Sequence, residues 1–487
     1  MASITKDRQC RQRKRSRRQR RQQRQAQRRA SRQLRRLEAQ APSTLRRFMD
    51  TFAEVFTRPT YYRFFVLLLA AVLTTGNHTV LNLLRTLGAL APGAPSSYHR
   101  VFSKRRWSLW GLAYLLAAWL IGHFVVSGSI ALAGDDTVDE HRGQKVFGKG
   151  RHRDAVRSSH AYTAFRYGHK WVVLAVLVRF PFASRPWALP ILVALYRSPS
   201  QDQKKRGRHK TPALLMRQML KVVLRWFPDR HFVFAGDGGY GTHELARTAA
   251  KRPRRLTLVS RFYADANLYE PPPPVVGKKP TGRPRGKGAK VPSPEQVVRK
   301  TKKPQKLNVA WYGGGRRDVE VVTGTAQWYK SGEGLVAVLW VYVHDCTGTH
   351  RDDYFFSTDV TRSAQAIIET FTGRWNIETT FQEMRAYLGL ETTRGRCAGT
   401  VLRAAPCLFG LYSVVAILYT QLPKRHARLG GIHWPGKEYV TFSDAITAVR
   451  RWLWQEWVFA IPGHHDAFSK LSLPFRQLVL HGLAPAA

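Results

Sequence analysis

Cysteine is scarce in this sequence. Four occur, Cys10, Cys346, Cys397 and Cys407, and no two of them form a CxxC pair. This spacing supports neither a zinc finger nor a disulfide framework, and it is typical of proteins that work in a reducing compartment. No apolar segment follows the basic N-terminus before Phe64, so the pattern of a signal peptide is also missing. We therefore expect a cytoplasmic protein.

Acidic residues are few as well. The chain of 487 residues has 31 Asp and Glu against 80 Lys and Arg, which gives a formal net charge of +49 and a sequence pI near 11.1. Solubility does not require such an excess, so a polyanionic partner is indicated, with nucleic acid as the first candidate. Residues 1–44 are a basic arm interleaved with glutamine. This arm is either a solvated tail or a non-specific DNA clamp, disordered or helical on DNA.

One long uncharged run raises the question of a membrane. Residues 107–133 carry no charge apart from a possible charge on His123, and their length could span a bilayer. However, "GH" and "SGS" interrupt the run, and its second half is rich in β-branched residues. A buried helix followed by a central strand is favoured. We therefore expect no membrane, with a membrane protein that has basic tails as an alternative.

The length and the 44% hydrophobic fraction predict two or three domains. Residues 45–127 have helical periodicity and form the predicted N-terminal DNA-binding domain. Within it, one helix predicted over 96–121 displays a basic cluster near its start, which resembles the reading helix of a helix-turn-helix. Any helical hairpin on a basic protein would look similar. The cluster consists of Arg100, Lys104, Arg105 and Arg106.

Strands alternate with helices from residue 128 onward. Two alternating segments, 161–167 and 170–180, predict a strand pair joined at Gly168. Buried strands, two helices and a further strand follow, so we predict an α/β fold with a mixed sheet and helices on both faces. The predicted domains are the first part of this core (128–263), a basic loop with a β insertion (264–357), a core helix segment (358–400) and a helical C-terminal region (401–487).

The insertion begins with a segment rich in Pro, Gly and basic residues, 264–305, which predicts an exposed loop. Three strands are expected to follow it. After them a long helix is predicted over 363–389.

Two basic loops are candidate DNA contacts. The "GRPRGK" segment resembles a hook for A·T-rich minor grooves, although a basic linker is the simpler interpretation. The loop before residue 211 is a candidate phosphate contact or a solvated loop. The residues concerned are Arg283 and Arg285 in the first loop, and Lys204, Lys205, Arg206, Arg208 and Lys210 in the second.

In so basic a chain, acids at strand ends stand out. Asp135 and Asp136 end one apolar strand in "IALAGDDT", and Asp237 ends another in "FVFAGDGGYG". Ligands of α/β sheets commonly lie beyond strand ends. Carboxylates that converge from separate elements are what two-metal cleavage of a phosphodiester requires. A simple turn is the alternative for each Asp before Gly.

Glu378 is a third acid, set between Arg374 and Arg385 on the predicted helix. At 100° per residue these three side chains share one helix face. They form either an ordinary surface ion pair or a metal-binding carboxylate flanked by two phosphate-binding guanidiniums. Nearby, His344, Asp345 and Cys346 point to opposite faces of an apparent strand and are expected to be structural.

These motifs together resemble the DDE transposases of bacterial insertion sequences, which have a ribonuclease-H-like core. The family signature of Tyr, Arg, Glu and Lys at spacings of two, three and six residues is matched by Phe371, Arg374, Glu378 and Arg385. Phe replaces Tyr and Arg replaces Lys at the outer positions. "ALAGDDT" and "VFAGDGGY" are similar to the motifs of the first and second catalytic Asp. The resemblance covers roughly residues 128–400.

The resemblance implies that Asp135, Asp237 and Glu378 hold two Mg²⁺ or Mn²⁺ ions, with Asp136 in reserve for Asp135. It implies a transposase that binds the terminal repeats of double-stranded DNA, cleaves them and joins the 3′-OH to target DNA, as a homodimer associated with the bacterial nucleoid. Some relatives flip a base onto a tryptophan of the insertion, and Trp311 and Trp328 are the candidates here, although a core role is favoured for both.

Two other functions remain open on the sequence. One is a ribonuclease-H-like nuclease that cuts without strand transfer, which would not need the β insertion or the flanking arginines. The other is a transposase-derived DNA-binding protein with an inactive site, against which the intact acids argue.

Overall fold

The computed structural model describes residues 2–154, 158, 161–199, 209–273, 286–429 and 435–485. The chain divides into two compact units. The helical unit contains Met1–Leu115, Ala386–Lys437 and Thr441–Ala487, and the sheet unit contains Leu116–Arg385 and Glu438–Val440. The predicted boundaries of the finer domains stay predictions.

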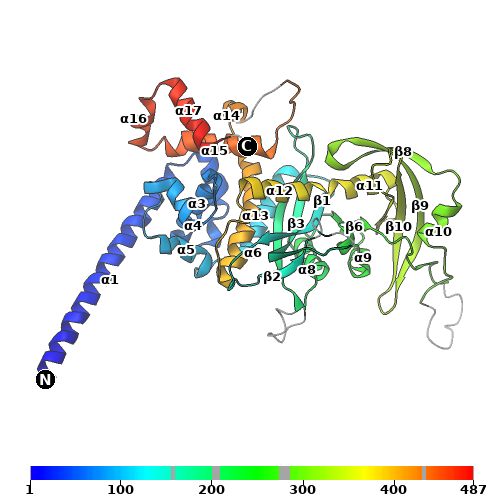
Figure 1. The fold of residues 1–487 in the computed structure, drawn as a ribbon, viewed down its shortest axis with the longest axis horizontal. Helices are drawn as coiled ribbons and strands as arrows, with labels where there is room; N and C mark the ends of the chain where they lie inside the picture. The colour runs from blue at the N-terminus through cyan, green and yellow to red at the C-terminus, as the bar shows by residue number, and fades with distance from the viewer. Residues whose placement is uncertain are drawn as a thin grey trace. The chain divides into compact units, whose positions relative to one another are not determined.

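The sheet unit is built on one mixed sheet, whose described strands run in the order β2-β3-β1-β5-β6-β11-β10-β9-β7, with β4 on β3 and β8 on β9 (Figure 1). Parallel pairing joins β1 to β5 and β5 to β6, whereas β3 is antiparallel to both β1 and β4. This confirms the predicted mixed α/β sheet. The strands are β1 (Ile130–Glu140), β2 (Gly150–Arg153), β3 (Phe165–Val178), β4 (Trp187–Tyr196), β5 (Phe232–Gly236), β6 (Leu256–Arg261), β7 (Leu268–Tyr269), β8 (Gln305–Ala310), β9 (Arg316–Lys330), β10 (Gly334–Asp345) and β11 (Asp353–Ser357).

The predicted turn at Gly168 is wrong. Residues 165–178 form the single strand β3, and Gly168 lies inside it opposite Glu140. A Cβ atom at this position would lie 1.7 Å from the backbone oxygen of Asp139. The glycine therefore allows a close approach of two backbones, which is the other common reason for glycine within a strand.

Helices lie on both faces of the sheet, as predicted. Because successive side chains of a strand point to opposite faces, β5 divides its contacts between two layers. Val233 belongs to the core that includes Ile367 and Ile368 of α11, whereas Phe234 lies near Met216 of α8 on the other face. The described helices of the sheet unit are α8 (Pro212–Trp226), α9 (His243–Ala250), α10 (Pro294–Lys300), α11 (Ala364–Gly373) and α12 (Asn376–Tyr387), and the residues of α6 (Leu109–Phe124) are divided between the two units after Leu115.

The insertion continues the core sheet because β11 pairs antiparallel with β6, and β10 and β9 follow it outward. The Pro-rich segment before β8 is less irregular than predicted. Its last part forms α10, which begins with a capping box between Ser293 and Gln296. Such a box satisfies free N–H groups at a helix start, so a short helix is stable there.

The helical unit differs from the prediction in the basic cluster. The helix predicted over 96–121 is broken into α5 and α6, and residues 104–108 lie outside both. The break is fixed by the buried Trp107, whose indole N–H donates to the Val101 carbonyl over 2.7 Å. Besides α6, the unit contains α1 (Ala2–Ala39), α2 (Ser43–Asp50), α3 (Arg58–Leu73), α4 (Val80–Leu87), α5 (Pro95–Ser103), α13 (Ala398–Thr420), α14 (Lys424–Leu429), α15 (Phe442–Leu453), α16 (His464–Ser469) and α17 (Leu473–Leu483), with the end of α12.

One described helix, α13, is long and apolar enough to cross a membrane by length and composition. In its most apolar window 61% of the residues are buried inside the protein. Core helices of soluble proteins have the same properties, so this helix is weak evidence for a membrane span. Tyr412 of this helix stacks on Phe442 of α15, with ring centres 4.0 Å apart. Core helices make contacts of this kind.

Candidate active site

Two of the predicted acids are brought together by parallel strands. Gly134 of β1 is the direct partner of Gly236 of β5, so the next residues, Asp135 and Asp237, lie side by side where β5 ends. The prediction that Asp135 and Asp136 end their strand is wrong, because β1 continues to Glu140 in pairing with β3. Asp237 also begins the short 3₁₀ turn that follows β5. The pairing of two strands 100 residues apart therefore places two carboxylates at one point, as ligand sites of such sheets require.

Glu378 comes to this point on α12, but the predicted continuous helix is interrupted. Helix α11 ends at Gly373 and α12 begins at Asn376. Between them the backbone N–H groups of Arg374 and Trp375 bond three residues back, to Phe371 and Thr372, at 3.1 Å each. This tighter spacing is that of a 3₁₀ turn. The expectation that Arg374 shares a helix with Glu378 is thus wrong, because Arg374 lies in the turn.

Arg374 is the centre of the site. Its side chain is only 5% exposed, and its guanidinium contacts Asp135 closely, Glu378 at 3.2 Å and Asp237 at 3.9 Å. A buried guanidinium needs such partners, since an unpaired buried charge is costly. The three predicted acids therefore converge on one cation.

Burial perturbs the acid–base chemistry of this group. It raises the pKa of Asp135 to about 7, although the Arg374 charge acts in the opposite direction. Burial also raises the pKa of Glu378, again against Arg374. For Arg374 itself, burial lowers the pKa, but the three carboxylates outweigh it and the pKa is raised. A raised pKa of this kind means that the positive charge near the carboxylate does not compensate for its burial.

Asp136 has different surroundings from Asp135. Adjacent strand residues point to opposite faces, and Asp136 binds Lys170 at 2.8 Å and accepts from the Tyr240 hydroxyl at 3.2 Å. Asp135 instead shares Arg374 with Glu378. The geometry therefore groups Asp135 with the other two acids and separates Asp136 from them. Lys170 and Tyr240 were not predicted, since nothing in their local sequence distinguishes them from other strand and turn residues.

The two outer positions of the signature have structural roles. Phe371 is buried at 1% exposure and stacks on Phe355 with ring centres 4.3 Å apart. Arg385 donates to the Thr137 hydroxyl and, over 3.2 Å, to the Val138 carbonyl. Arg385 thus ties α12 to the strand that carries Asp135.

The other predicted basic site residues are exposed or lie outside the described residues. Arg100, Lys104, Arg105 and Arg106 are exposed in the helical unit. Lys210 is exposed and donates to Gln218 at 3.2 Å. The remaining basic-loop candidates, which lie outside the described residues, are Lys204, Lys205, Arg206, Arg208, Arg283 and Arg285.

Both insertion tryptophans are buried. Trp311 is 9% exposed and belongs to the core under α11, and Trp328 is 6% exposed and packs edge-on against Phe262. A more exposed aromatic pair was missed. Trp375 is 41% exposed, adjoins Arg374 and lies edge-on to Tyr312 with ring centres 5.7 Å apart.

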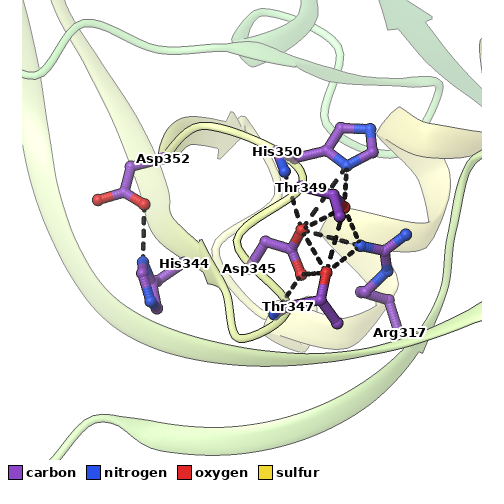
Figure 2. A network of polar contacts seen from close by, with 7 residues as sticks. All are labelled: Arg317, His344, Asp345, Thr347, Thr349, His350 and Asp352. Carbon is purple, nitrogen blue, oxygen red and sulfur yellow. Dashed lines mark hydrogen bonds and ion pairs between the residues drawn. The ribbon is translucent and has the colours of Figure 1, made fainter.

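A polar network closes the loop between β10 and β11, as Figure 2 shows. The buried Asp345 carboxylate accepts from Arg317 at 2.8 Å and from the backbone N–H groups of Thr347 and His350. Thr349 adds a hydroxyl bond of 3.0 Å. His344 instead binds Asp352 at 2.8 Å, on the other side of the loop. These residues hold the loop together, which matches the structural role expected of them.

Two family models match parts of this chain. The model described as "DDE superfamily endonuclease" matches residues 51–318, more than half of the chain. The chain belongs to this DDE superfamily. A second model, "Archaeal putative transposase ISC1217", matches residues 329–408. The first match contains Asp135 and Asp237, and the second contains Glu378, so the DDE protein has its acids within matched segments.

No curated protein matches this DDE protein. A piggyBac transposase synaptic complex with hairpin DNA, solved by cryo-EM, resembles it with a TM-score of 0.40 and 10% sequence identity, over 88% of this chain and 77% of that chain.

The residues fit the divalent metal that membership of the DDE superfamily implies. Asp135, Asp237 and Glu378 offer the oxygen donors that Mg²⁺ and Mn²⁺ prefer. The raised pKa values of Asp135 and Glu378 indicate carboxylates that would gain from further positive charge. In the chain alone, Arg374 is the group that supplies this charge.

Proposed function

We propose that this DDE protein is the transposase of a bacterial insertion sequence, which binds the terminal repeats, cleaves them and joins the freed 3′-OH to target DNA. The observation that carries the proposal is the convergence of Asp135, Asp237 and Glu378 on the buried Arg374. A structural ion pair needs one carboxylate for one guanidinium. Three carboxylates from three elements are more than this one guanidinium needs, and such a group of acids is suited to metal-dependent phosphoryl transfer.

In this proposal the three acids hold two Mg²⁺ or Mn²⁺ ions. When bound, such ions supply the activation of a water and the stabilisation of the leaving oxygen. Arg374 would hold the carboxylates together before metal binds, and would contact the scissile strand once metal takes its place, because a guanidinium binds phosphate as readily as carboxylate. Arg385 holds β1 and α12 in register through Thr137. The freed 3′-OH then attacks a target phosphodiester, with no covalent link between protein and DNA.

The basic surfaces would bind the DNA itself. The exposed cluster Arg100, Lys104, Arg105 and Arg106 is suited to phosphate contacts, and the net charge of +49 supports a large polyanionic partner. A homodimer would hold the two element ends together, and the site of action would be the bacterial cytoplasm, on the nucleoid.

The first test uses purified protein and DNA that carries the flanks of its own gene. Metal-dependent nicking should occur at a discrete terminal repeat with Mg²⁺ or Mn²⁺ and not with EDTA. Glu378→Gln should abolish nicking, by at least about 1000-fold, while DNA binding survives, since removal of a metal ligand affects the reaction and not the basic surfaces. Asp135→Asn should behave in the same way.

Asp136→Asn is the matched control, because Asp136 is the neighbouring acid bound to Lys170 and Tyr240. It should keep most of the activity. Nicking without joining to a target plasmid would replace the transposase with a nuclease that lacks strand transfer. Binding without nicking in either metal would identify an inactive DNA-binding protein instead.

A further inference from the structure

A group of three buried side chains lies on β1 and β3, outside the candidate active site. Asp139 is near the end of β1, His141 follows the strand, and His169 faces Asp139 across the antiparallel pair. Their exposed fractions are 0%, 8% and 2%. One potential metal-ligating atom from each lies within 4.8 Å of the others. The group is not among the acids that converge on Arg374, so the proposed cleavage site does not explain its clustering.

The distances within the group are at the long end for hydrogen bonds, including the one between His141 and Asp139, and they suit a shared metal ion. Nε2 of His141 lies 3.4 Å from one carboxylate oxygen of Asp139, and Nδ1 of His169 lies 3.4 Å from the other. Hydrogen bonds between nitrogen and oxygen are usually about 2.7–3.2 Å long. Two ligands at about 2.1 Å from a tetrahedral zinc ion are separated by about 3.4 Å. Each imidazole nitrogen is therefore as far from an Asp139 oxygen as two ligands of one zinc ion are from each other, and the three ligand atoms lie within 4.8 Å of one another.

The hydrogen bonds orient the ligands for this purpose. Nε2 of His169 lies 2.9 Å from the Phe147 carbonyl, which can only accept, so Nε2 carries a proton and Nδ1 is the ring atom that faces Asp139. Metal-binding histidines commonly donate their other N–H to a carbonyl in this way. The Asp139 carboxylate is itself fixed by the backbone N–H of His169 at 3.0 Å and by Trp171 at 3.1 Å.

We propose that Asp139, His141 and His169 bind one divalent transition-metal ion, with zinc as the best match, which fastens the end of β1 to β3. Two imidazoles and one carboxylate are a donor set for zinc, whereas Mg²⁺ prefers oxygen ligands throughout. Asp139 is four residues beyond Asp135, about 13 Å along an extended strand. The site is thus separate from the three catalytic acids, and it does not depend on the proposed function.

The test measures metal content of the full-length protein without an affinity tag. After dialysis against a chelator and titration with Zn²⁺, one zinc ion per chain should be retained, and added Mg²⁺ should not displace it. His141→Gln and His169→Gln should each weaken zinc binding by more than about 100-fold, because loss of a ligand exceeds the loss of an outer partner.

Two controls separate this site from others. Glu378→Gln alters the catalytic acids, and His344→Gln removes an imidazole that is 47% exposed. Both should retain one zinc ion. The wild-type protein loaded with Co²⁺ should also show the strong visible absorption of tetrahedral coordination, which needs no variant to fold. Absence of retained zinc and of this absorption would overturn the proposal, as would equal zinc retention by the His169→Gln protein.

Discussion

The buried carboxyl group of Asp135 should make the metal-free protein lose stability as the pH rises. Burial raises its pKa from the ordinary 3.8 to about 7, even though Arg374 opposes the change. A group with a raised pKa binds its proton more tightly in the folded state. Its contribution to stability is therefore complete below about pH 4 and is lost as the pH rises through about 7.

The size of this effect follows from the shift. About three pK units correspond to about 4 kcal/mol at roughly 1.4 kcal/mol per unit. The side chain of Asp135 is 15% exposed, so solvent screening reduces this figure only moderately. Asp135→Asn has no titrating group at this position. We therefore compare the free energy of unfolding of the wild type with that of the variant at each pH. As the pH rises from about 4 to about 8, this difference should shift against the wild type by up to about 4 kcal/mol.

Urea denaturation in EDTA across this pH range measures the difference, with circular dichroism to check that both proteins fold. Subtraction of the two curves removes the titration of other groups. Adding Mg²⁺ at the upper end of the range should restore stability to the wild type and not to Asp135→Asn, because the ion binds the ionised carboxylate. Parallel pH curves for the two proteins would refute the argument that Asp135 is buried with too little positive charge.

Two further predictions concern the scaffold. Asp345→Asn should lower the free energy of unfolding by about 3 kcal/mol in urea denaturation, because it leaves Arg317 without its buried anion. A loss below about 1 kcal/mol would contradict this role for the loop network. Gly168→Ala should destabilise the protein by at least about 2 kcal/mol, since its Cβ would meet the Asp139 backbone oxygen. Thermal unfolding of the two proteins measures this loss. Gly122→Ala is the control in these measurements, because nothing lies within 4 Å of a Cβ there. Equal melting temperatures for the two alanine variants would mean that the close approach at Gly168 is not real.

Much of the α/β core could be predicted from local pattern. Apolar segments that end in "GDD" and "GDGG" identify two strands, because the apolar run and the small residues are local properties. Asp237 does follow the end of its strand, whereas the pairing with β3 extends β1 beyond Asp135 and Asp136 to Glu140. The candidate acids could be singled out for the same reason, helped by the rarity of acids in this chain. Two further predictions were wrong because they depend on tertiary contacts. Gly168 lies within a strand because it must approach the backbone of Asp139. The basic helix is broken because the buried Trp107 bonds to the Val101 carbonyl.

Spacing along the chain was sufficient to select Asp135, Asp237 and Glu378 as candidates, but not to separate Asp135 from Asp136. That separation requires the sheet, which turns one carboxylate toward Arg374 and the other toward Lys170 and Tyr240. The pairing of Asp139 with His169 has the same origin, since the two are 30 residues apart and meet only across antiparallel strands. A local pattern records which residues face the same side, whereas long-range pairing determines which of them meet.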